Sequence, residues 1–235
     1  MRPTLLALVS ALASPLAMAH SLWIAPAGSG EMQVQYGEPE IRLNERSPGK
    51  LDHLVLLRAE RTAGAQTRAL TWQLRGTGFM LQGGLGEGGA LAQARSTGVR
   101  NNPSSPGGVH TLYHSRRAPW PLQATPAAMA LDIVPAGEPN LFAIHFRDAP
   151  LRQGTLKVIA PSLWIQVHDI DTQGRVRIDT PWRGEYVLEV ETREPRTGEV
   201  SGQRYDTLVH RATLSFAQPE GLVVENPRPA QYRAE

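Results

Sequence analysis

Hydrophobic residues recur at every second position along most of this 235-residue chain, and that period constrains the fold more than any other feature. Side chains of a strand alternate between the two faces of a sheet, whereas a helix repeats about every 3.6 residues. Near the carboxyl end, one face of a predicted strand carries Leu208, His210, Ala212, Leu214 and Phe216. The sequence therefore predicts an all-β protein made of antiparallel β-sandwiches.

Turn-forming segments at 171–174 and 181–184 separate the predicted strands. Residues 82–108 are rich in Gly, Ser, Asn and Pro, so we expect a long loop there. The expected organisation is two β-sandwich domains in tandem, residues 20–150 and 151–218, followed by a flexible tail at 219–235.

The first residues are typical of an export signal. Arg2 precedes an apolar stretch from Leu5 to Ala13, and Ala17-Met18-Ala19 has the small-x-small pattern of a cleavage site. We therefore expect residues 1–19 to be a signal peptide and the protein to be periplasmic. The apolar stretch is too short to span a membrane, and no later one approaches twenty residues, so we expect no membrane span in the mature chain.

Composition excludes several classes of chemistry. The chain has no cysteine, which excludes disulfides, thiolate metal sites, cysteine nucleophiles and a lipid-modified terminal cysteine. The net charge is +2 and no basic run occurs, so nucleic acid is not an expected partner. No serine-nucleophile elbow, phosphate loop or dinucleotide fingerprint is present, and nothing predicts an enzyme. Glu38 and Glu40 fall near turns, where solvated carboxylates are expected.

The predicted cleavage leaves His20 as the first residue of the mature protein. A terminal histidine offers its α-amine and its ring Nδ1 to one metal ion. Nitrogen donors suit nickel, copper and zinc. The expected ligand is therefore a divalent transition metal.

Three further histidines are candidate ligands. His110 and His114 are four residues apart, but their segment reads as a strand, which places them about 13 Å apart. Only one of the two is therefore expected to join His20, and the sequence leaves open which. His145 is a third candidate because its ring faces away from Ile144 and its apolar neighbours. His210 lies on an apolar face and is expected to be a hydrogen-bonded core histidine.

Two other patterns have simple structural explanations. Asp169-x-Asp171-x-Gln173-Gly174 is similar to the start of a calcium loop but lacks the acidic twelfth residue, so a tight turn is expected. The five tryptophans allow a sugar-stacking platform, although such residues in β-sandwiches are more often core or interface residues. They are Trp23, Trp72, Trp120, Trp164 and Trp182.

Four segments, taken in order, resemble a family of bacterial periplasmic proteins associated with nickel and cobalt uptake (the NikM-like periplasmic component). They are His20 to Pro26 with Val34 to Glu38, Leu131 to Pro135 with Pro139, Asp171 to Arg175 with Gly184 to Leu188, and Ala212 to Phe216. The resemblance implies a second domain of prealbumin or immunoglobulin type and a membrane metal transporter as partner. It also favours nickel or cobalt as the divalent metal, with copper as the alternative. Thr172 after Asp171 reverses the usual order of the family's hairpin motif, so no role is transferred to either residue.

Two alternatives to nickel or cobalt handling remain open at this stage. A copper carrier or a copper-dependent oxidative enzyme can also use a terminal histidine on a β-sandwich. A non-metal module that binds an envelope partner requires no metal at all.

Overall fold

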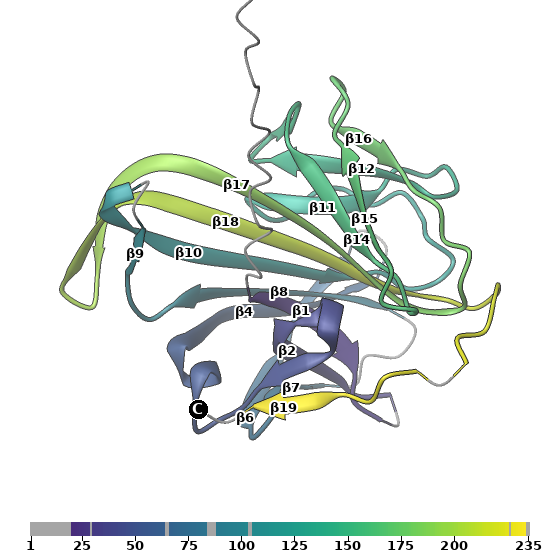
Figure 1. Ribbon diagram of the computed structural model, residues 1–235, viewed down its shortest axis with the longest axis horizontal. Helices are drawn as coiled ribbons and strands as arrows, with labels where there is room; N and C mark the ends of the chain where they lie inside the picture. Colours follow the sequence, from purple (N-terminus) through teal and green to yellow (C-terminus); the bar gives the residue numbers. More distant parts are fainter. Residues whose placement is uncertain are drawn as a thin grey trace, which may run out of the picture.

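The computed structural model describes residues 20–28, 30–63, 66–83, 88–102, 105–225 and 227–233. The predicted signal peptide lies outside these residues. Within them, helix is limited to two short 3-10 turns, Pro39–Ile41 and Lys50–His53. The strands form three sheets that are stacked as three layers (Figure 1). The predicted all-β class, with mainly antiparallel sheets, is confirmed.

The middle layer is a nine-stranded sheet. Its strands are, in order, β15 (Ile165–Asp169), β14 (Thr155–Ile159), β17 (Gly184–Val200), β18 (Gln203–Gln218), β10 (Ser105–Arg117), β8 (Gly89–Ser96), β4 (Leu54–Ala63) and β5 (Gln66–Ala69), with β9 (Arg100–Asn102) paired to β10. Neighbouring strands are antiparallel except β10 and β18, which run parallel with His114 opposite Ala212. This parallel pair joins strands from the two halves of the chain.

A smaller sheet covers each face of the middle layer. The four-stranded sheet contains β11 (Leu131–Pro135), β12 (Leu141–Phe146), β13 (Ala149–Pro150) and β16 (Arg175–Arg177). The six-stranded sheet contains β19 (Gln231–Arg233), β3 (Leu43–Glu45), β2 (Met32–Glu38), β7 (Gly78–Gln82), β6 (Thr71–Arg75) and β1 (Ser21–Pro26). In Figure 1 the four-stranded sheet lies above the long central strands and the six-stranded sheet below them.

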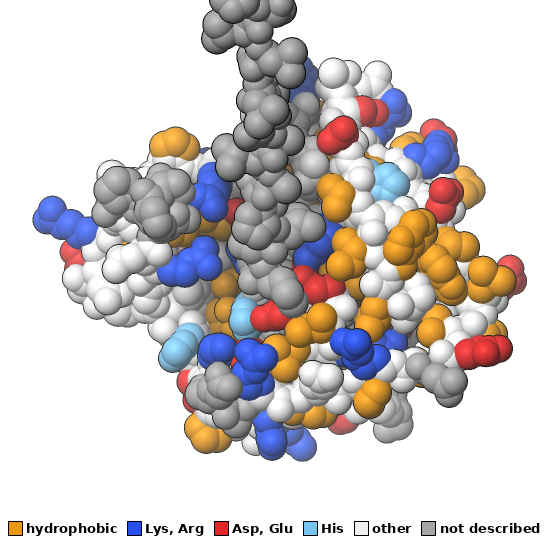
Figure 2. All heavy atoms as spheres, in the orientation of Figure 1, with side chains coloured by type: hydrophobic (Ala, Val, Ile, Leu, Met, Phe, Trp, Pro, Cys, Tyr) orange, Lys and Arg blue, Asp and Glu red, His pale blue; other side chains and the backbone are white. Residues whose placement is uncertain are grey.

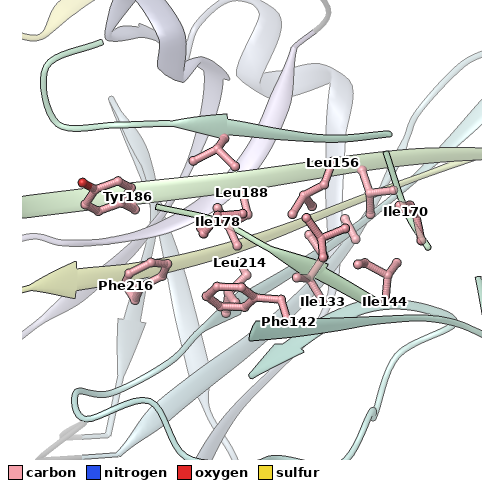
Figure 3. Packing of buried hydrophobic residues seen from close by; sticks show 14 of the residues in the cluster. Ile133, Phe142, Ile144, Leu156, Ile170, Ile178, Tyr186, Leu188, Leu214 and Phe216 are labelled. Carbon is pink, nitrogen blue, oxygen red and sulfur yellow. The ribbon is translucent and has the colours of Figure 1, made fainter. Parts of the chain in front are cut away.

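Strand β18 shows how the middle sheet contacts both outer sheets. Leu214 and Phe216 are fully buried in the core against the four-stranded sheet (Figure 3). The alternate residues Thr213 and Ser215 point to the other face, where their hydroxyls donate to the β1 carbonyls of Leu22 and Ile24 at 2.6 and 2.5 Å. Because successive side chains of a strand face opposite ways, the two faces of one strand meet different neighbours.

The two cores lie on opposite faces of the middle sheet. In the first, Ile133, Phe142 and Ile144 point toward Leu188 and Leu214 (Figure 3). The second, under the six-stranded sheet, is formed largely by Leu22, Ile24, Val34, Leu51, Leu54, Leu56, Phe79, Leu81, Ala90, Ala92, Ala94 and Tyr113.

The molecule does not divide at Pro150 as the sequence suggests. The first core combines Ile133 and Phe142, which precede Pro150, with Leu188 and Phe216, which follow it. The parallel pairing of β10 with β18 also carries the middle sheet across the expected boundary. Such a pairing joins strands that are distant in the sequence, and no local pattern signals it.

Two expected irregular segments contain strands. The predicted loop at 82–108 holds β8 and β9, and β8 pairs with β10 and β4 on its two sides. Strand β8 has alanine at every second position, which is a strand pattern. The sequence nevertheless predicted a loop, because alanine has a low strand propensity and glycines flank the segment. The predicted tail at 219–235 contains β19, which pairs in parallel with β3.

The predicted turn at Asp171 is confirmed. Its carboxylate accepts hydrogen bonds from the backbone N–H groups of Arg175 and Gln173, both at 2.8 Å. These bonds hold the pKa of the carboxyl below its usual value. Gly174 has a φ of +74°, the left-handed conformation that favours glycine. A hydrogen-bonded turn accounts for this motif without calcium.

Hydrophobic side chains gather on one side of the face in Figure 2, where Figure 1 draws β14 and β15. On and beside the edge strand β15, Trp164, Ile165 and Val167 are exposed. Trp164 also contacts Trp182 edge to face, with ring centroids 5.2 Å apart.

Candidate functional site

His20 lies directly before β1, between the six-stranded sheet and the middle sheet. Its ring Nε2 forms a very short contact with Glu45 Oε1, and its Nδ1 lies 3.7 Å from Glu38 Oε1. The ring of Tyr36 packs beside it with centroids 5.2 Å apart. From the middle sheet, Arg211 donates to the backbone carbonyl of His20 at 2.8 Å.

The pairing of three short strands brings these side chains together. Strand β1 pairs with β2 so that Ser21 lies opposite Gly37, and β2 pairs with β3 so that Gly37 also lies opposite Asn44. A Cβ atom on Gly37 would stand 2.0 Å from the carbonyl oxygen of Leu43, so this approach requires glycine. Glu38 follows Gly37, and Glu45 follows Asn44.

Glu45 determines which ring nitrogen of His20 is protonated. The Glu45 side chain is completely buried, and the ammonium of Lys50 lies 3.7 Å from its Oε1. A carboxylate only accepts hydrogen bonds, so the Nε2 that contacts it carries the proton. When the ring is neutral, the lone pair is therefore on Nδ1, which lies on the side of Glu38.

Tyr36 of β2 packs beside the His20 ring, and Tyr113 of the middle sheet packs against Tyr36. The hydroxyls of Tyr36 and Tyr113 are 3.3 Å apart and their rings meet edge to face. Burial, followed by the proximity of Tyr113, raises the pKa of Tyr36, so its hydroxyl remains neutral. The pair gives His20 an uncharged wall on this side.

Glu40 is held in a separate charged cluster. Lys157 Nζ lies 3.1 Å from Glu40 Oε1 and also forms a short ion pair with the buried Glu189. Burial of Lys157 opposes its charge, but the two carboxylates outweigh that effect and raise its pKa. Glu38 and Glu40 are both buried, so the expectation of solvated carboxylates is wrong for both.

His110 and His114 lie on the other face of the middle sheet from His20. On β10, Tyr113 faces Tyr36 and the His20 side, so its neighbour His114 faces the four-stranded sheet. On β18, Arg211 reaches His20, while its neighbour His210 meets His114. The structure therefore does not bring either β10 histidine to His20.

His114 and His210 form a buried pair. His114 Nε2 and His210 Nδ1 are 3.2 Å apart, and the ring planes are within 6° of parallel with centroids 5.4 Å apart. The two ring centroids are farther apart than the two nitrogens by about two ring radii. The nitrogens therefore lie on the line between the rings, and the rings meet edge to edge. Gln93 contacts His114 Nδ1 at 3.0 Å, and Glu194 contacts His210 Nε2 at 3.2 Å.

The donor in each of these hydrogen bonds can be assigned by starting from Glu194, because a carboxylate only accepts. Glu194 accepts from His210 Nε2 and from Arg147, the latter at 2.6 Å. His210 Nδ1 then accepts from His114 Nε2, and His114 Nδ1 accepts from the Gln93 amide. Burial, followed by the proximity of His210, lowers the pKa of His114 to about 3. Each ring is neutral and both of its nitrogens are used, which confirms the expected core role of His210.

The remaining candidate ligands have other environments. His110 is buried, contacts the Ser96 hydroxyl at 3.0 Å and packs against the Tyr205 ring; burial lowers its pKa. His145 is half-buried and lines a shallow hollow with Arg147 and Asp148. In the part of the chain that the structure describes, no group of three or more His, Cys, Asp or Glu side chains is arranged to hold a metal ion.

Sequence reasoning missed Glu45 and Glu38. Both follow the points where β2 and β3 come together, and pairing between strands is not visible in a single strand's pattern. The only local signal is glycine at position 37, which marks a close backbone approach.

The fold and site define an all-β protein in three layers, with a half-buried histidine at the start of its first described strand. No family model, curated protein or solved structure matches the chain. No helix in the described ranges is long and apolar enough to cross a membrane.

Proposed function

We propose that this chain is a periplasmic metal-binding protein that captures a divalent transition metal at the mature amino terminus, in association with nickel or cobalt uptake. The observation that carries the proposal is the environment of His20: Nε2 is bound to a buried carboxylate, and Nδ1 faces a second carboxylate. The predicted signal peptide supports the compartment, and the family resemblance supports the choice of metal.

The donor set fits a metal ion. The proposed ligands are the α-amine of the processed chain, His20 Nδ1 and Glu38 Oε1. Two atoms that each bond one ion at about 2.0–2.2 Å lie up to about 4 Å apart. The 3.7 Å between His20 Nδ1 and Glu38 Oε1 falls within that limit. The amine is not a side chain, so the set is compatible with the lack of a three-side-chain metal group in the described residues.

Glu45 has a supporting role in this proposal. Metal-bound histidines usually donate their other ring N–H to a carboxylate or carbonyl, which fixes the ring and makes the ligand more basic. The His20–Glu45 contact has this form. Glu45 itself stands too close to Nε2 for an ion to lie between them.

The ligands favour a borderline divalent ion. Two nitrogens and a carboxylate oxygen suit nickel, cobalt or copper in the divalent state better than monovalent copper, which prefers sulfur donors. Three protein ligands leave open positions for water and for exchange, as capture and delivery to a transporter require.

The test is isothermal titration of protein processed to begin at His20, with nickel, cobalt and copper in turn. We expect submicromolar binding that is lost in His20→Ala and in a variant with one alanine inserted before His20. Glu38→Gln is expected to weaken binding more than Glu45→Gln, because it removes a ligand rather than its support. His53→Ala, at an exposed histidine, is the control and should bind as the parent does.

No binding tighter than micromolar in the processed parent protein would overturn the proposal. Binding that survives the alanine insertion would place the metal elsewhere. Ascorbate-driven turnover of a polysaccharide by the copper-loaded protein would favour the copper enzyme instead.

A further inference from the structure

A large open cleft lies away from His20, at one end of the middle sheet. Its volume is about 990 Å³, and its walls come from the ends of β4 and β10 and from the segment 118–126. Binding sites for small molecules usually enclose about 300–1,000 Å³ and combine apolar walls with a few polar groups. The cleft has the size of such a site.

Two arginines line the cleft, and they differ in their partners. Arg117 is bound through both of its terminal nitrogens to Glu185, at 2.7 and 2.9 Å, so a carboxylate already balances its charge. Arg61 forms no ion pair with any residue that the structure describes. Its Nε is shielded from solvent, which leaves the terminal nitrogens of the guanidinium to meet a ligand in the cleft.

Arginine presents its N–H groups in a planar fork that matches the two oxygens of a carboxylate. Arg61 lines the cleft and pairs with no carboxylate of the described residues, so its terminal N–H groups are suited to a carboxylate on a ligand there.

Trp120 supplies a flat apolar surface in the same cleft. Its side chain is 45 % exposed, although it is among the largest apolar side chains of the protein. Thr62, Gln123 and Thr125 add hydroxyl and amide groups to the walls. A guanidinium, an indole face and several neutral polar groups together match a sugar that carries a carboxylate.

We propose that this cleft binds an acidic sugar of the hexuronic type, alone or in a short oligomer. Arg61 pairs with the sugar carboxylate, one face of the ring stacks on Trp120, and the neutral polar side chains receive the hydroxyls. The site is independent of the metal site proposed above.

The test compares galacturonate, trigalacturonate and neutral galactose by ligand-observed NMR and titration calorimetry on the full protein in EDTA. Galacturonate is expected to bind at least about tenfold more tightly than galactose, the usual effect of one charge-assisted hydrogen bond. This comparison uses only the parent protein, so it does not depend on whether a variant folds.

Variants then assign the contacts. Arg61→Gln is expected to reduce the affinity for galacturonate to that for galactose, and Trp120→Ala to weaken both. The matched controls are Arg58→Gln, on the same strand but paired with Glu60, and Trp164→Ala, an exposed tryptophan outside the cleft. Lack of saturable binding, equal affinities for the charged and neutral sugars, or equal losses in the control variants would each overturn the proposal. Loss of metal binding in His20→Ala with unchanged sugar binding leaves it intact.

Discussion

His20 and His114 lie on opposite faces of one sheet, and the two regions use a histidine ring differently. His20 gives one nitrogen to Glu45 and keeps the other beside Glu38, in a half-buried position. His114 gives both nitrogens to neighbours inside the protein, Gln93 and His210. A histidine whose hydrogen bonds are all made inside the core stabilises the fold, whereas one with a free lone pair can bind a ligand.

The adjacent residues of β10 and β18 explain how the two regions arise. Tyr113 and Arg211 contact the His20 side, and their neighbours His114 and His210 meet on the other face. The strand period therefore separates two polar sites that are one residue apart in the chain. The comparison makes a clear division: substitutions in the His114–His210 pair should change stability, and substitutions of His20 and its carboxylate neighbours should change metal binding.

The largest stability effect is expected for His114→Ala. The substitution leaves a cavity in a buried layer and removes the donor to His210 Nδ1, which remains buried. We expect a loss of about 3 kcal/mol in the free energy of unfolding, measured by urea denaturation, with unchanged nickel affinity. A loss below about 1 kcal/mol, or weaker nickel binding at equal folded fraction, contradicts the division.

The acid dependence of stability should also come from the His114 side. The pKa of His114 is lowered to about 3 in the folded state from 6.5, and that of His210 is lowered as well. At a pH between these two pKa values, the unfolded chain binds more protons than the folded protein does. The free energy of unfolding is therefore highest above about pH 6.5 and falls as the pH decreases. At pH 5, protonation of His114 in the unfolded chain should lower the free energy of unfolding by about 2 kcal/mol relative to its value at high pH.

Urea denaturation at pH 7 and pH 5 measures this dependence, with His114→Asn as the comparison. The variant should lose less stability between the two pH values than the parent protein. Other charged groups face the pair: Glu194, Arg147 and Arg196 act on His210. Equal losses in parent and variant would assign the acid sensitivity to groups other than His114.

The sequence predicted the fold class, the strand at His114, the core position of His210 and the turn at Asp171, because each depends on a local pattern. It did not predict the three-layer arrangement, since the β10–β18 pair joins distant segments. It nominated His20 but expected a second histidine beside it. The structure instead places Glu38 and Glu45 there, through strand pairing that the sequence alone does not reveal.

On the His20 side, Glu45→Gln should act on binding. The amide still accepts a hydrogen bond from Nε2 but lacks the charge that makes the imidazole more basic. We expect about a tenfold loss of nickel affinity, measured by calorimetry on the processed protein. Unchanged affinity would mean that Glu45 has no part in metal binding.

The smallest effect is expected where the two regions are joined. The Ser215 hydroxyl donates to the carbonyl of Ile24 and fixes β1 to the middle sheet. Ser215→Ala should reduce the free energy of unfolding by about 1 kcal/mol and leave both histidine environments as they are. A loss of metal binding in this variant would show that the position of β1 on the sheet controls the His20 site.

The most direct test of the account is NMR of the histidine ring nitrogens in the processed protein, before and during titration with nickel. Before metal is added, His20 should carry its proton on Nε2, and His114 and His210 should both be neutral at pH 7. During titration, paramagnetic broadening should remove the His20 ring signals first, while the hydrogen-bonded pair of His114 and His210 persists. Broadening that begins at His114 or His210, or that leaves His20 unaffected at saturating nickel, would contradict the assignment of binding to one face and stability to the other.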